Sequence, residues 1–192
     1  MPPPLSANEA YRVPFSSLTP FLLISFSLAW GIVGLYIFLA EPMGAMFGQL
    51  TGNHPLLFLA VYAPAIAAFT LVALDSGLTG LRHFLRQMLL WRCGEAWYTF
   101  LIIAIPLIFV GGSAIRGNLF TEPFPFASCQ ALLVALAVAT IKGPVEEFGW
   151  RGLALPLLQK AVAPIWAGLI LGAIWGLWHL PAFLLSGTQQ SE

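Results

Sequence analysis

Long apolar runs dominate this sequence and define the elements that it predicts. Each run is about as long as a helix must be to cross a hydrocarbon core roughly 30 Å thick. A further apolar run begins near Ala127 and is interrupted by Lys142 and two glutamates. The chain is therefore predicted to span a membrane about five times. The uninterrupted runs, free of Lys, Arg, Asp and Glu, are residues 18–39, 55–74, 96–113 and 163–185.

These spans are expected to be helices, because lipid offers the backbone no hydrogen-bond partners. The strict alternation of apolar and polar residues that marks a barrel strand is absent from the sequence. Pro64 and Pro106 fall inside two of the runs and are tolerable there as kinks. The predicted fold class is all-α, a polytopic integral membrane helical bundle.

Composition agrees with a chain whose main surroundings are a lipid bilayer. Hydrophobic residues make up 59% of the sequence and charged residues only 8%, against about 25% charged residues in soluble domains. The formal net charge is zero. Without a basic surface there is nothing to attract a nucleic acid, so no nucleic-acid partner is expected.

The chain divides into three parts by composition. A polar, proline-rich tail covers residues 1–17, and three spans follow within residues 18–126. Between the second and third spans lies a basic segment near residues 79–92, which predicts either an amphipathic helix in the membrane interface or an ordinary connecting loop. Residues 127–192 hold the remaining spans and the unusual charges.

Orientation follows from the distribution of Lys and Arg, which gather in cytoplasmic loops of membrane proteins. The basic loops all lie on the same side as the N-terminus, so we expect a cytoplasmic N-terminus. The basic residues on that side are Arg12, Arg82, Arg86, Arg92, Arg151 and Lys160, against Arg116 on the other.

A pair of adjacent carboxylates lies at the end of the interrupted run. On a helix, Glu147 and Arg151 are four residues apart and meet on one face as an ion pair. Glu146 points about 100° away and is left without a cation. A carboxylate in that position accepts a proton more readily, as a general base must. The alternative is an interfacial charge cluster with no chemistry.

His179 is the one histidine within an apolar run, and Trp175 precedes it by one turn. The midpoint between Glu146 and His179 falls at the turn before residue 164, so an antiparallel helix pair would place the two side chains at equal depth. Together they could hold a zinc ion or polarise a water molecule. The alternative is a structural hydrogen bond between helices. His54 and His83 are expected in solvated loops.

Two segments at these residues resemble the family of CAAX proteases and bacteriocin-processing enzymes, which are intramembrane endopeptidases. PVEEFGWRGLALPLLQ carries the pattern E-E-x-x-x-R at Glu146, Glu147 and Arg151. LILGAIWGLWHLPAF carries an aromatic residue four positions before a histidine, at Trp175 and His179. The resemblance covers roughly residues 127–187.

The resemblance implies hydrolysis of a peptide bond near the membrane, in a peptide or protein substrate reached from the membrane or the cytoplasm. Glu146 would activate water together with His179, with or without a zinc ion held by the two. It also implies CAAX-box protein processing and a multi-pass protein of a bacterial plasma membrane.

The family's third motif, H-x-x-x-N or H-x-x-x-D, does not occur before Glu192. Residues 127–192 are therefore expected to be an incomplete family core, in a fragment or a shortened relative. Two other functions stay open. One is a non-catalytic membrane binding or immunity protein that keeps the fold, and the other is a small transporter with Glu146, Glu147 and His179 as a proton relay.

Overall fold

The computed structural model describes residues 13–51, 54–88, 94–117 and 144–185, together with the single positions 130, 133 and 137. Within these ranges the regular structure is helical throughout, which agrees with the predicted all-α fold. The chain divides into two compact units, one comprising Met1–Met88 with Ile141–Glu192 and the other Leu89–Thr140. The first unit contains both family-like motifs.

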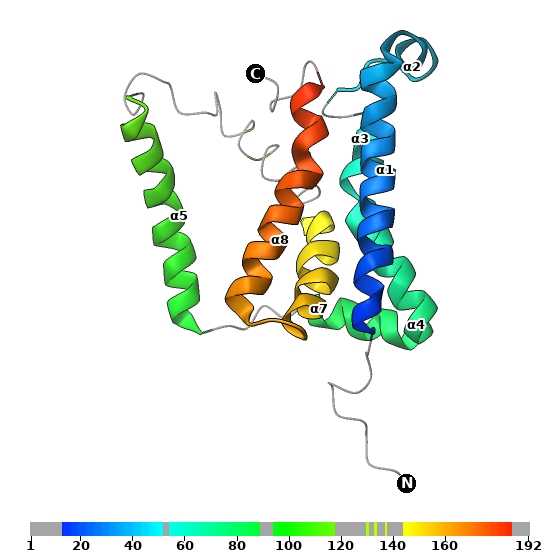
Figure 1. Ribbon diagram of the computed structural model, residues 1–192. Coiled ribbons are helices and arrows are strands. Elements are labelled where there is room, and N and C mark those ends of the chain that lie inside the picture. The colour runs from blue at the N-terminus through cyan, green and yellow to red at the C-terminus, as the bar shows by residue number, and fades with distance from the viewer. Residues whose placement is uncertain are drawn as a thin grey trace. The chain divides into compact units, whose positions relative to one another are not determined.

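Helix α1 (Leu18–Phe38) packs against most of the other helices of the first unit. It follows a short 3₁₀ turn, η1 (Phe15–Ser17), and contacts α3, α4 and α8 (Figure 1). Its buried residues recur every three or four positions and therefore form one stripe along the helix. They are Phe21, Ser25, Ala29, Val33 and Tyr36.

The predicted second span, residues 55–74, is helical, and the kink expected at Pro64 divides it between two helices. The structure has α3 (Pro55–Val61), a break at Tyr62, and then α4 (Ala63–Met88). Pro64 explains the break, because proline has no N–H to donate to the carbonyl of Ala60, four residues earlier. The membrane-crossing candidate here is Ala63–Met88 instead.

The loop placement predicted for His54 and His83 is also only partly right. His83 lies inside α4. His54 is the N-cap of α3, where its Nδ1 accepts a hydrogen bond from the Leu56 N–H at 3.2 Å. Its Nε2–H donates to the carbonyl of Phe47 at 2.7 Å, at the end of helix α2 (Ala40–Phe47). His54 therefore joins the end of α2 to the start of α3.

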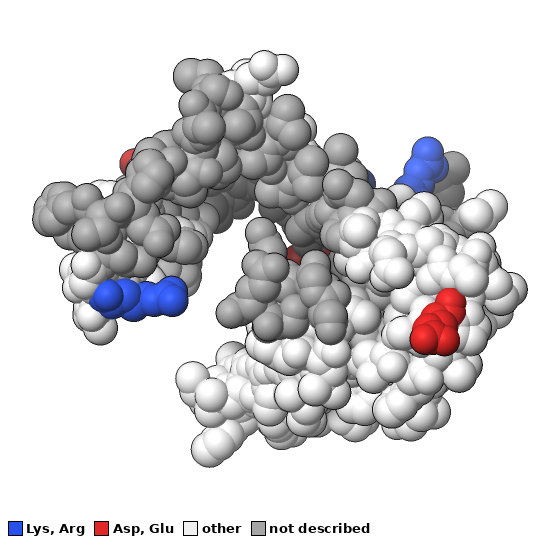
Figure 2. Space-filling model, turned by 90° about the horizontal axis from the view of Figure 1, so that it is seen from above, with Lys and Arg blue, Asp and Glu red and all other residues white. Residues whose placement is uncertain are grey.

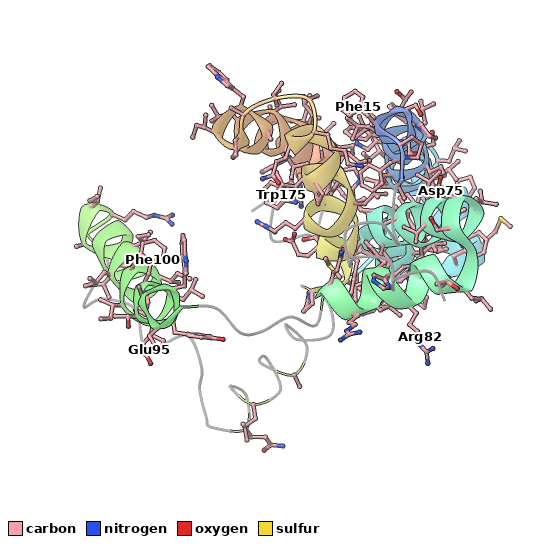
Figure 3. All side chains as sticks on the ribbon, turned by 90° about the horizontal axis from the view of Figure 1, so that it is seen from below. Phe15, Asp75, Arg82, Glu95, Phe100 and Trp175 are labelled. Carbon is pink, nitrogen blue, oxygen red and sulfur yellow. The ribbon has the colours of Figure 1, made fainter. Side chains whose placement is uncertain are left out.

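Helix α4 bends sharply at Gly77, whose φ of 59° and ψ of −156° lie outside the helical region. Only glycine adopts such angles without steric cost. Asp75 and Arg82 mark the two arms on either side of the bend (Figure 3). The second arm contains the basic segment as far as Met88, and it is helical. Its position in the membrane interface stays a prediction.

The segment with the paired glutamates is one interrupted helix, residues 144–159, called here the motif helix. It is helical from 144 to 149, forms a π-helical turn, η2 (Trp150–Ala154), and ends with α7 (Leu155–Gln159). After a short turn comes α8 (Pro164–His179), followed by the 3₁₀ turn η3 (Leu180–Leu184). In Figure 1, α7 and α8 form an antiparallel hairpin, as the predicted pairing of the two sites requires.

The second unit contributes α5 (Glu95–Ile115), an apolar helix whose side chains are almost all exposed within the protein. Such a surface suits contact with lipid. Charged side chains are few and scattered on the face shown in Figure 2.

Four helices of the described part are long and apolar enough to cross a membrane. About five spans were predicted, and the described part of the chain contains four candidates. Most of the remaining predicted span, which begins near Ala127 and includes Lys142, lies outside the described residues. So do residues 1–12 of the polar tail and residues 186–192. The four helices are Phe15–Phe38, Ala63–Met88, Glu95–Ile115 and Pro164–Leu184.

Candidate functional site

Two glycines let the motif helix lie directly on both arms of α4. A Cβ atom added to Gly149 would overlap the carbonyl of Pro64. One added to Gly152 would come within 2.9 Å of the Met88 sulfur and 3.1 Å of the Phe84 ring. Small residues permit such close approach between helices in membranes. Sequence reasoning missed this role, although two glycines three positions apart within a helical run were a usable signal.

The π-helical turn begins at Trp150, three residues after Glu147. The Leu155 N–H donates to the carbonyl of Trp150, five residues earlier. Pro156 comes next and has no N–H, so the regular pattern of hydrogen bonds could not have continued through it unchanged. Such wide turns occur often at functional sites. Here the turn lies within one helical turn of both glutamates.

The ion pair expected between Glu147 and Arg151 is confirmed. Arg151 Nη1 contacts Glu147 Oε1, and the arginine side chain is 69% exposed while that of Glu147 is 32% exposed. The second oxygen of Glu147 is buried and, among the described residues, lacks a hydrogen-bond partner. Arg151 therefore pairs with Glu147 rather than with Glu146.

Glu146 is half-buried, and no hydrogen bond or ion pair to it is found in the described part of the chain. Its role as a general base, like the other predicted site roles, stays a prediction.

The contact of His179 with a backbone carbonyl favours one tautomer of its ring. Its Nδ1 lies 2.9 Å from the carbonyl oxygen of Trp175. A carbonyl oxygen can only accept, so Nδ1 carries the proton and donates it. In the neutral ring the lone pair then lies on Nε2, free to accept a hydrogen bond or to bind a metal.

Two indoles confine the imidazole of His179. The Trp175 ring lies 4.2 Å from it, centroid to centroid, and the Trp178 ring lies edge-on at 4.7 Å. The expected pairing of Trp175 with His179 on one helix face is thus present. Trp175 is labelled on α8 in Figure 3.

Aromatic contacts bring the two motifs together. The rings of Trp150, one turn after Glu146, and Trp178, next to His179, are 5.7 Å apart at an angle of 72°. Phe21 of α1 packs edge-on against Trp150 at 5.3 Å. Sequence reasoning gave neither Trp150 nor Trp178 a role, because in an apolar helix nothing distinguishes a tryptophan that packs inside from one that faces lipid.

The described residues do not form a complete zinc site. Glu146 and His179 are donors of the types that zinc binds, but no hydrogen bond joins them in the described structure. Nor does that part of the chain bring three or more His, Cys, Asp or Glu residues together. A metal held by Glu146 and His179 therefore stays a proposal.

Comparison with known proteins adds independent information about the same segment. Residues 128–190 match the family described as type II CAAX prenyl endopeptidase Rce1-like. A protein named CAAX prenyl protease 2, from Methanococcus maripaludis, is 31% identical over 94 residues, which cover 48% of this chain. The match spans only 33% of that protein's length. No solved structure gives a significant match.

Proposed function

We propose that this chain is an intramembrane endopeptidase that cleaves a peptide bond near the membrane surface, because residues 128–190 match the family described as type II CAAX prenyl endopeptidase Rce1-like. The observation that carries the proposal is the contact between Trp150 and Trp178. It holds the helix of Glu146 against the helix of His179, as a shared site requires.

The charges around Glu146 support a role as general base. Arg151 pairs with Glu147, and among the described residues no ion pair to the neighbouring Glu146 is found. General bases of this kind contribute about 10²- to 10⁴-fold to a reaction rate. In the proposed mechanism Glu146 removes a proton from water as the water oxygen attacks the scissile carbonyl. Glu146 then returns that proton to the leaving amine.

The tautomer of His179 suits the same water. With the Nδ1 proton engaged by the Trp175 carbonyl, Nε2 can accept a hydrogen bond from the water's second proton. Two acceptors, Glu146 and His179, would then direct the water's lone pair at the substrate. A zinc ion bound by these two side chains would supply Lewis-acid chemistry at the same place.

The proposed substrate is a prenylated peptide ending in a CAAX sequence, reached from the membrane or the cytoplasm. The similarity to CAAX prenyl protease 2 from Methanococcus maripaludis supports this class. The apolar helices agree with a multi-pass membrane protein. We propose that the basic side, with the N-terminus, faces the cytoplasm.

The test is cleavage of a farnesylated, fluorescence-quenched CAAX peptide by the protein in liposomes. E146Q should lower the rate at least 100-fold, because glutamine cannot take a proton. The matched control is E41Q, the same change at an exposed glutamate of α2, which should cleave at the wild-type rate. Wild-type cleavage by E146Q would refute the proposed role, and no cleavage by the wild type across prenylated peptides would refute the proposed activity.

A further inference from the structure

Helices α1 and α8 exchange two indole hydrogen bonds. The Trp178 Nε1–H donates to the carbonyl of Ser25 at 3.2 Å. In the other direction, the Trp30 Nε1–H donates to the carbonyl of Trp178 at 3.1 Å. Both bonds join residues about 150 positions apart, and both involve Trp178. The side chain and the backbone of this one residue are therefore tied to α1.

The second of these bonds meets a specific need. Trp178 lies in the last turn of α8, where backbone carbonyls can accept hydrogen bonds from groups outside the helix. An indole N–H from α1 satisfies that carbonyl. Since Trp178 is only 7% exposed, leaving its carbonyl or its indole N–H without a partner would be costly.

Trp178 precedes His179 in the sequence, and its ring packs edge-on against the imidazole at 4.7 Å between centroids. The imidazole lies between the Trp175 and Trp178 rings, with Nδ1 on the Trp175 carbonyl. One hydrogen bond fixes the Trp178 indole and the other its backbone carbonyl, and a fixed indole in contact with the imidazole limits rotation of the imidazole. It therefore preserves the geometry in which Nδ1 is the donor and Nε2 is free.

We propose that Trp178 is a positioning residue, which α1 holds in place through Ser25 and Trp30 so that His179 keeps its Nδ1–H tautomer with Nε2 directed to the reaction. The inference rests on the proposed function, because that function gives His179 its task. It extends the site to α1, a helix outside the family match of residues 128–190.

The protein contains an internal reference for this tautomer. His54 accepts at Nδ1 and donates from Nε2, so it is the opposite tautomer of His179. Nitrogen chemical shifts distinguish the two forms directly. Neither histidine needs substrate for the measurement.

The experiment is NMR of protein with ¹⁵N-labelled histidine in detergent micelles at mildly alkaline pH, with signals assigned through H54N and H83Q. In the wild type, His179 should be protonated at Nδ1 and His54 at Nε2. W178F keeps a ring but loses the bond to Ser25, and it should move the ¹⁵N shifts of His179 to values averaged between tautomers. The shifts of His54 should not move.

The matched control is W166F, the same change at an exposed position near the start of α8, which should leave His179 as in the wild type. If W178F does not fold, as loss of the His54 pattern would show, W30F removes only the bond to the Trp178 carbonyl and decides the question. His179 protonated at Nε2 in the wild type, or unchanged in the deciding variant, overturns the proposal. Because no substrate is involved, this outcome is separate from cleavage by E146Q, which tests the function itself.

Discussion

Gly149 of the motif helix lies against the Pro64 backbone of α4 so closely that no side-chain atom fits between them. Pro64 begins the first arm of α4, just after the break at Tyr62. Pro64 thus ends helix α3, and its backbone packs against the motif helix, which carries the two glutamates. The position of Glu146 depends on this contact, although Gly149 has no chemistry of its own.

Replacing Gly149 with alanine should therefore destabilise the protein. Overpacking a close contact costs about 1–3 kcal/mol, and the backbone of Pro64 cannot rotate away as a side chain could. The free energy of unfolding, measured by titration with denaturing detergent, should fall by that amount. G168A is the matched control, since nothing lies within 4 Å of its added Cβ. Equal stability of the two variants would contradict the contact.

A second prediction concerns the bend in α4. Gly77 has a φ of 59° and a ψ of −156°, a combination open essentially to glycine alone, and another residue held there costs on the order of 1–3 kcal/mol. G77A should lower the unfolding free energy by about this much, or straighten the helix and displace its basic arm. G34A, in the regular helix α1 with open space around it, should not be destabilised. A stabilised G77A would show that the bend is not required.

The ion pair should contribute little to stability by itself. Arg151 is well exposed, and exposed pairs are typically worth about 0.2–1 kcal/mol. A double-mutant cycle of E147Q and R151Q should give a coupling energy in that range. A coupling well above this range would mean that the pair is more strongly shielded than its exposure indicates.

His54 should matter for the junction of α2 and α3. H54A removes the side chain that caps α3, and loss of a cap typically costs about 0.5–2 kcal/mol. H54N keeps an acceptor suited to the N-cap and should recover much of the loss. Thermal unfolding of the two variants compares them. If H54A is as stable as H54N, the cap contributes nothing measurable.

Local patterns were sufficient for the class of protein and for one contact of the site. Runs of apolar residues indicate helices of membrane length, because lipid leaves the backbone no other partner. The pairing of Glu147 with Arg151 follows from a spacing of four on a helix, whatever the rest of the chain does. The antiparallel helix pair expected on either side of the turn before residue 164 is likewise present, as the hairpin of α7 and α8.

Only the tertiary structure decided the contacts between segments far apart in the sequence. In a helix of a soluble protein, the polar face lies toward water, so the apolar face can be identified as the side that packs inside. Here the stripe of α1 that begins at Phe21 is buried and the opposite side is exposed, yet both are mostly apolar, because lipid and protein interior favour the same residues. The packing of whole helices therefore decided which tryptophan donates to which carbonyl. It also decided that Gly149 lies on Pro64.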